Sequence, residues 1–201
     1  FIRPEKKIVS IEDTPELQLP HPHWVPHVAR TAIGEVGKKI GEVDLFDLLK
    51  ESLRQRPDYI IVGEVRGKEA YVLFQQMATG HPSLATIHAE NMDKLIDRLI
   101  TPPISLPPSL IASVDVIVFM ATTRYKERQV RRVTEIVEIV GFDRKKNQPL
   151  TKVVFKWDPM TDTFTSSKSV VVKEVGRMKG MTEEEVKEEL ERRMFVLDWM
   201  R

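Results

Sequence analysis

The feature that most constrains the fold of this chain is the uninterrupted apolar run Tyr59-Ile60-Ile61-Val62, which Gly63 and Glu64 follow directly. A strand with one face in water alternates apolar and polar residues, whereas a strand covered on both faces reads as a continuous apolar run. Strands of the second kind are typical of parallel sheets that helices cover on both faces. The run therefore predicts an inner strand of a parallel sheet.

Strand and helix patterns alternate along the first 120 residues. Strands are predicted at residues 7–11, 59–62, 83–88 and 114–120. Helices are predicted from Asp44, from about Lys68 to Gly80, and around residues 92–99, because apolar residues recur there at helical spacing. Residues 14–41, between the first predicted strand and the first predicted helix, are rich in Pro, His and Gly and are predicted to form a long loop. This order indicates an α/β fold with a mostly parallel sheet flanked by helices.

The pattern changes after Ala121. Residues 132–142 and 152–157 are strand-like and a polar link joins them, which predicts a β-hairpin. Residues 164–175 are predicted to add one more strand, and Thr182 with Glu185 forms the capping-box pattern of a charged helix. The apolar stripe of that helix is interpreted as core packing; it comprises Val186, Leu190, Met194 and Leu197. We therefore expect two domains, an α/β core at residues 1–142 and an extension of hairpin and helix at residues 143–201.

Composition excludes several kinds of site and partner. The chain has no cysteine, which excludes disulfides, thiolate zinc sites and a cysteine nucleophile. Lys and Arg number 31 and Asp and Glu number 30, so the formal net charge of +1 gives no support to a nucleic-acid partner. No apolar run approaches the roughly 18 residues that a membrane-spanning helix needs. Any membrane association is therefore expected to run through a partner.

Polar side chains follow three of the predicted strands at the points where they end. Glu12 and Asp13 follow the first strand, Glu64 and Arg66 follow the second, and His88 ends the third. Taken alone, each is more often a solvated or structural residue. Parallel strands place their carboxyl ends along one edge, which is where open α/β sheets bind ligands. Together the carboxylates and the imidazole predict a site for a metal–phosphate ligand and an activated water.

A histidine-rich segment offers a different metal site. His21, His23 and His27 carry imidazoles, which are common zinc ligands. The residues around them are mostly Pro or aromatic, and no acidic or thiolate ligand is adjacent. The loop interpretation is therefore preferred over metal binding.

Three motifs resemble those of the type II and type IV secretion ATPases. Residues 8–16 resemble the Asp box of that family, and residues 53–66 resemble its atypical Walker B segment, in which Glu stands at the end. Residues 79–89 resemble its His box. The three motifs occur in the family's order and spacing between residues 8 and 89. The segment at residues 21–30 is similar to the archaeal branch, which includes pilus and archaellum assembly motors.

The resemblance implies a RecA-like ATPase core that uses ATP and Mg²⁺. It assigns Glu12, with Asp13 beside it, to activation of the attacking water, and Glu64 to Mg²⁺ through water molecules. His88 is expected near the γ-phosphate.

Nucleotide-site roles also fall on His81 and Arg66. In the family, arginines from a neighbouring subunit or domain complete the site; the candidates are Arg54, Arg56, Arg66 and Arg98.

The family forms homo-hexameric rings at the inner face of the cell membrane, in the cytoplasm, and passes its motion to a polytopic membrane platform protein. The resemblance therefore implies an ATP-hydrolysing motor that powers type II secretion or assembly of a type IV pilus or archaellum. Two alternatives stay open: a non-hydrolysing module that docks on the platform, and a RecA-like DNA motor.

One motif of the family is absent from the printed sequence. No run has the form G-x-x-x-x-G-K-[ST], the P-loop whose backbone N–H groups and Lys hold phosphates. In the family this loop comes just before the strand predicted at residues 7–11. We therefore expect the P-loop upstream of residue 1, and without it we expect no ATP hydrolysis.

Overall fold

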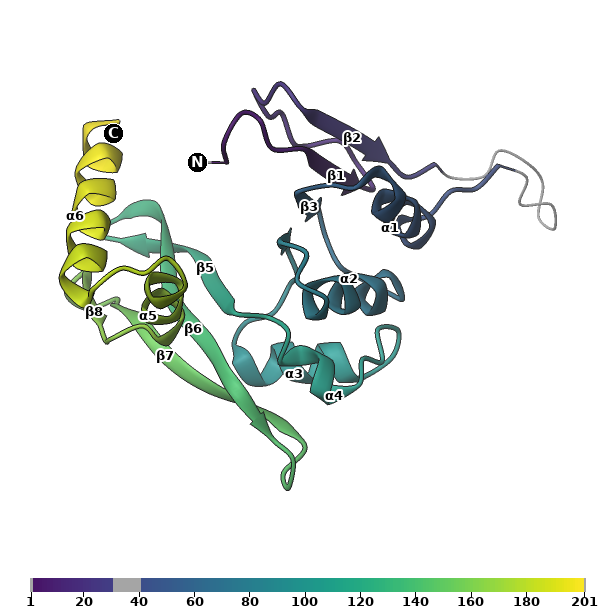
Figure 1. The fold of residues 1–201 in the computed structure, drawn as a ribbon. Coiled ribbons are helices and arrows are strands. Elements are labelled where there is room, and N and C mark those ends of the chain that lie inside the picture. Colours follow the sequence, from purple (N-terminus) through teal and green to yellow (C-terminus); the bar gives the residue numbers. More distant parts are fainter. Residues whose placement is uncertain (1, 31–40, 201) are drawn as a thin grey trace. The chain divides into compact units, whose positions relative to one another are not determined.

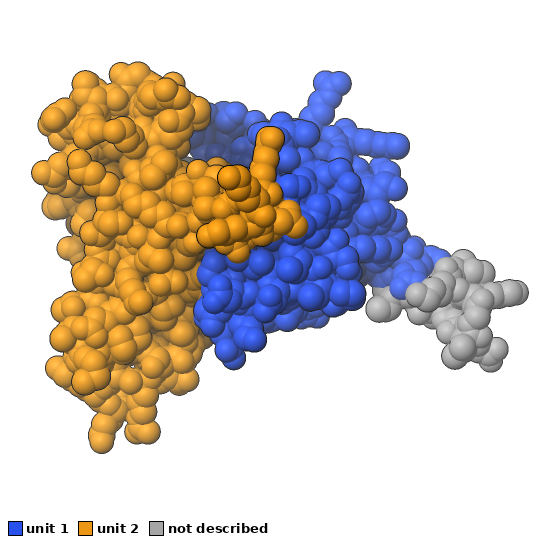
Figure 2. All heavy atoms as spheres, turned by 90° about the horizontal axis from the view of Figure 1, so that it is seen from below, with its two compact units in different colours: residues 1–114 blue, residues 115–201 orange. Residues whose placement is uncertain are grey.

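The computed structural model describes residues 2–30 and 41–200. The chain forms two compact units, residues 1–114 and residues 115–201, which Figure 2 distinguishes by colour. Residues 115–142, which the sequence pattern grouped with the α/β core, thus fold with the second unit. Each unit has its own sheet.

The first unit contains a parallel sheet of four strands in the order β2-β1-β3-β4 (Figure 1). Its strands are β1 (Ile8–Glu12), β2 (Trp24–Val28), β3 (Tyr59–Val62) and β4 (Ser83–Ala85). Its helices are α1 (Leu45–Ser52), the 3-10 turn η1 (Leu53–Gln55), α2 (Glu69–Ala78), α3 (Met92–Ile100) and α4 (Pro108–Ile111). The apolar run at residues 59–62 does form an inner strand, so this prediction is confirmed.

Strand β2 lies in the segment that was predicted to be a long loop, so that prediction was wrong in part. Pro26 stands in the middle of the strand, opposite Ser10 of β1. A proline cannot donate to a ladder, and in the middle of a regular strand it is tolerated on an edge strand. β2 pairs with β1 alone and is such an edge strand. The local sequence therefore reads as loop, although the neighbouring strand holds it extended.

The predicted helix signals have the expected backbone roles. The Asp44 carboxylate caps α1 by accepting from the backbone N–H of Asp47 at 2.9 Å. Gly80 adopts φ of +88° just after α2, a left-handed conformation that glycine enters without steric cost. The sequence thus predicted the start of α1 and the end of α2.

The second unit contains an antiparallel sheet in the order β5-β6-β7-β8 (Figure 1). Its strands are β5 (Val116–Tyr125), β6 (Arg128–Asp143), β7 (Gln148–Asp158) and β8 (Thr163–Ser166), and its helices are α5 (Val170–Met178) and α6 (Glu183–Trp199). The predicted hairpin of residues 132–142 and 152–157 is confirmed by the pairing of β6 with β7. The strand predicted at residues 114–120 was expected in a mostly parallel sheet, but it belongs to β5 and pairs antiparallel with β6.

Two predictions for the C-terminal part were wrong. The strand predicted at residues 164–175 ends at Ser166, and residues 170–178 form α5, because Ser169 caps this helix by accepting from the Val172 N–H at 2.9 Å. In α6 the capping box of Thr182 and Glu185 is present, but no residue of the helix is buried. Met194 and Leu197 of its apolar stripe are 67% and 50% exposed, so the stripe is not core.

No helix in residues 2–30 and 41–200 has the length and apolarity to cross a membrane.

An ion pair in the second unit predicts how its stability depends on pH. Arg132 donates to Asp162 through Nε and Nη2, both at 2.9 Å, and Trp157 Nε1 donates at 2.8 Å. The Arg132 hydrogen bonds, and then that of Trp157, lower the Asp162 pKa from 3.8 to about 2. Because folding favours the ionised carboxyl, its contribution to stability is complete above pH 3.8 and is lost as the pH falls toward 2.

We expect the Tm of wild type to exceed that of Asp162→Asn at neutral pH, and the difference to shrink as the pH falls through this window. Thermal unfolding followed by tryptophan fluorescence between pH 2 and 7 measures it. A difference that stays constant with pH would contradict the role given to the Asp162 charge.

Candidate functional site

The predicted strand-end residues meet at the carboxyl edge of the parallel sheet. Strands β1 and β3 are neighbours, with Glu12 the last residue of β1 and Glu64 two residues after β3. The chain leaves β1 toward β2 on one side and leaves β3 toward β4 on the other. The connections that follow these two neighbouring strands thus run to opposite sides. Open α/β sheets bind ligands at such a topological switch point.

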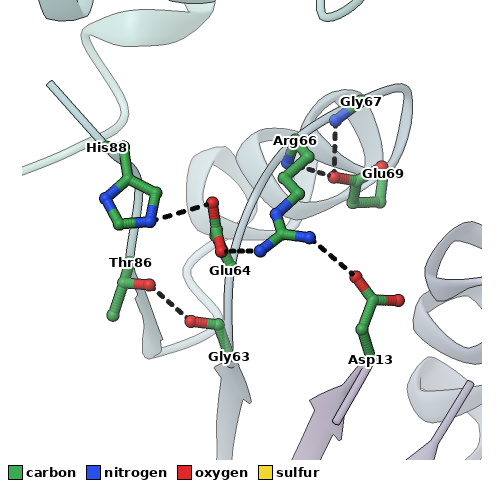
Figure 3. Close-up of polar contacts among 8 residues, drawn as sticks. All are labelled: Asp13, Gly63, Glu64, Arg66, Gly67, Glu69, Thr86 and His88. Carbon is green, nitrogen blue, oxygen red and sulfur yellow. Dashed lines mark hydrogen bonds and ion pairs between the residues drawn. The ribbon is translucent and has the colours of Figure 1, made fainter.

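The Glu64 carboxylate is the centre of this site. Its Oε2 lies 2.5 Å from Arg66 Nη2, and its Oε1 lies 3.4 Å from His88 Nε2, on the other side of the carboxylate (Figure 3). The side chain of Glu64 is 18% exposed, whereas that of His88 is 82% exposed. The Arg66 hydrogen bond lowers the pKa of Glu64, and the charges of Arg66, His88 and Arg98 act in the same direction against the effect of burial. Glu64 is therefore ionised at neutral pH.

Arg66 joins the segments that follow β1 and β3. Its guanidinium lies between Glu64 and Asp13, with Nη1 4.0 Å from Asp13 Oδ2 (Figure 3). The Glu64 hydrogen bond raises the pKa of Arg66, and the charges of Asp13 and Glu16 add to the effect. One cation thus balances a cluster of carboxylates at the sheet edge.

The other candidate arginines differ in their relation to this cluster. The charge of Arg98, in the last turn of α3, contributes to the lowered pKa of Glu64. Arg54 lies 3.7 Å from Glu51 in its own helical segment. Arg56 follows η1 with φ of 51°. Among the four candidate arginines, Arg66 and Arg98 have charges that lower the pKa of Glu64.

Glu12 is buried, with 3% of its surface exposed. Its Oε1 accepts from the backbone N–H groups of Glu16 at 3.0 Å and Leu17 at 3.1 Å, so the carboxylate holds the turn that follows β1. Gly63 lies against it, since a Cβ at Gly63 would come within 3.0 Å of Glu12 Cγ. The assignment of Glu12 to water activation stays a prediction.

Asp13 and Glu16 are the exposed carboxylates of the same turn. Sequence reasoning named Asp13 but missed Glu16, whose charge also acts on Arg66. The signal that could have found it is its position in the Asp-box segment itself, three residues after Asp13.

The two histidines of the His box lie beyond opposite ends of β4. His88 follows the strand and reaches Glu64, whereas His81 precedes it and lies 3.2 Å from Thr79 Oγ1 through Nδ1. The structure therefore does not bring His81 to the edge that carries Glu64. Its assignment to the nucleotide stays a prediction.

Two histidines of the segment at residues 21–27, His21 and His27, have protein partners. His21 Nε2 lies 2.9 Å from the Arg3 carbonyl oxygen, and His27 Nε2 lies 2.8 Å from Gln55 Nε2. No group of three or more His, Asp or Glu within residues 2–30 and 41–200 is arranged to hold a metal ion unaided. Mg²⁺, however, is commonly held by one or two carboxylates together with phosphates and water. The ionised Glu64, with Asp13 across Arg66, fits that requirement.

Comparison with known proteins shows the family of this chain. The family model described as type II/IV secretion system protein matches residues 1–151. Protein MJ1287 of Methanocaldococcus jannaschii is 43% identical over 194 residues, which cover 96% of this chain and 71% of that protein. MJ0900 of the same organism is 40% identical over 205 residues, which cover 100% of this chain and 36% of that protein.

A solved structure is also similar. The crystal structure of the VirB11 ATPase from the Brucella suis type IV secretion system, in complex with sulphate, aligns with a TM-score of 0.54 and 28% identity. The alignment covers 67% of this chain and 40% of the VirB11 chain. This chain thus spans well under half of MJ0900 and of VirB11. With the family model matching three quarters of its length, the chain belongs to the type II/IV secretion system protein family.

Proposed function

We propose that the complete protein is an ATP-hydrolysing motor subunit that powers type II secretion or the assembly of a type IV pilus or archaellum-like filament. The observation that carries the proposal is the cluster of Glu64, Arg66, Asp13 and His88 at the carboxyl edge of the sheet, in a chain of this family. The archaeal relatives MJ1287 and MJ0900 support the archaeal branch.

The residues of the cluster have chemically distinct roles in this proposal. Glu64, kept ionised by Arg66, is the carboxylate for Mg²⁺ through its waters, and the ion when bound would neutralise charge on the phosphates. His88 reaches Glu64 from the exposed side, where it can contact the terminal phosphate. Arg66 keeps Glu64 and Asp13 near one another despite their like charges.

The proposal extends to assembly and location. We infer a RecA-like ATPase core that works in a homo-hexamer, with the P-loop supplied by the complete protein. The motor acts in the cytoplasm at the inner face of the membrane, where a polytopic platform protein receives its motion. Nucleic acid is not a partner, in keeping with the balanced charge of +1.

The test is Mg²⁺-dependent ATP turnover by the complete protein and its Glu64→Gln variant. Glutamine keeps the size of the side chain but cannot carry the charge, so turnover is expected to fall by about 10–100-fold and to need more Mg²⁺. Glu90→Gln is the matched control, because Glu90 is an exposed carboxylate two residues after His88. Wild-type protein that binds no ATP would overturn the motor proposal, and unchanged Mg²⁺ dependence in Glu64→Gln would remove Glu64 from its role.

A further inference from the structure

Glu69 is a buried carboxylate that the roles above do not use. It is the first residue of α2 and only 6% exposed. Its Oε1 accepts from the backbone N–H of Arg66 at 2.6 Å and from that of Gly67 at 2.7 Å (Figure 3). Glu69 therefore binds the backbone of the very residue whose guanidinium lies between Glu64 and Asp13.

These hydrogen bonds are of a strong kind. A carboxylate that accepts backbone N–H groups forms charge-assisted bonds, and burial makes the loss of such partners costly. Glu69 also lies in the first turn of α2, where the helix dipole favours an anion. The preceding residue, Lys68, makes no side-chain cap, so Glu69 provides the anion at this helix start.

The loop before Glu69 is fixed on its other side as well. The Val65 N–H donates to the Thr86 carbonyl oxygen at 2.9 Å, and the Thr86 hydroxyl donates to the Gly63 carbonyl oxygen at 2.5 Å. Gly67 passes close to the carboxylate, since a Cβ there would come within 3.1 Å of Glu69 Oε2. Residues 63–65 are thus tied to the segment after β4, and Glu69 is what ties residues 66 and 67.

We propose that Glu69 is a positioning residue, which fixes the backbone of Arg66 so that its guanidinium stays between Glu64 and Asp13. The proposal rests on the proposed function for its effect on turnover. A guanidinium that reaches one carboxylate at 2.5 Å and the other at 4.0 Å depends on where its Cα is held. Without the anchor, Arg66 swings away from the pair, and the two carboxylates lose the cation between them.

The experiment compares Glu69→Ala and Glu69→Gln in the complete protein. Backbone hydrogen exchange measured by NMR is expected to show at least a tenfold loss of protection at Arg66 and Gly67 in Glu69→Ala, while Val65 keeps its protection. ATP turnover is expected to fall about 10–100-fold through kcat with little change in KM. Glu69→Gln keeps an oxygen acceptor in the same place and is expected to restore part of both losses.

Ser52→Ala serves as the stability control. Ser52 is buried in the same unit and its hydroxyl donates to the Leu49 carbonyl oxygen at 2.7 Å, away from the site. Unchanged protection of Arg66 and Gly67 in Glu69→Ala, or a turnover loss no larger than that of Ser52→Ala, would overturn the positioning role. The exchange result does not need turnover. A wild type without ATPase activity would therefore refute the motor proposal while hydrogen exchange still decides whether Glu69 holds Arg66.

Discussion

Glu12→Gln is expected to bind ATP as the wild type does and to hydrolyse it about 10²–10⁴-fold more slowly, the usual contribution of a positioned general base. Glutamine cannot take a proton from the attacking water. It does retain a carbonyl oxygen that can accept from the N–H groups of Glu16 and Leu17. The turn after β1 should therefore survive, and the loss should be one of catalysis. Nucleotide binding, single-turnover hydrolysis and Tm of the complete protein measure the three quantities separately.

The burial of Glu12 makes the comparison variants decisive. Asp13→Asn and Glu16→Gln remove the two exposed carboxylates of the same turn, whose charges act on Arg66. If Glu12→Gln turns over normally, Glu12 is only the anchor of the turn. A loss in one of the other two variants would then assign water activation to that carboxylate.

The sequence allowed the prediction of the site better than that of the sheet around it. The apolar run at residues 59–62 predicted an inner strand of a parallel sheet, and β3 is one, with Ile60 and Val62 buried and Tyr59 and Ile61 half-buried. Glu12, Glu64 and His88 then follow from the rule that parallel strands share a carboxyl edge. A periodic pattern does not record the direction of a partner strand, which is why β5 was predicted in the wrong sheet.

Other features escaped prediction because a distant contact decides them. Pro26 argues against a strand in the sequence. β2 nevertheless forms, because it pairs with β1 alone and is an edge strand, where a proline is tolerated. Glu69 looks like any acidic residue in the first turn of a helix, and only its contacts with Arg66 and Gly67 show that it is buried in the site's support. The three valines after Ser169 favour a strand. The segment nevertheless begins a helix, and Glu138, 31 residues before Ser169, accepts a hydrogen bond from the Ser169 hydroxyl at the start of that helix.

Glu138→Ala is expected to lower the free energy of unfolding of the second unit by about 2–3 kcal/mol, because hydrogen bonds to a charged group are worth roughly 1.5–3 kcal/mol. Glu138 lies on β6 and is only 2% exposed. It accepts from the Ser169 hydroxyl, and from the Val170 N–H at 2.7 Å, so a strand of the sheet holds the first residues of α5. Alanine fills none of these roles. Urea denaturation followed by circular dichroism measures the loss.

Two further variants separate the effect of the Glu138 hydrogen bonds from a general effect of charge on β6. Glu135→Ala removes another carboxylate of β6. The Glu135 side chain makes no hydrogen bond or ion pair in the described structure, so its removal is expected to change the free energy of unfolding by less than about 0.5 kcal/mol. Glu138→Gln keeps an acceptor for Val170 and is expected to lie between alanine and wild type. If Glu138→Ala were no more destabilising than Glu135→Ala, α5 would be held to the sheet by its apolar contacts, and the buried carboxylate would need a different explanation.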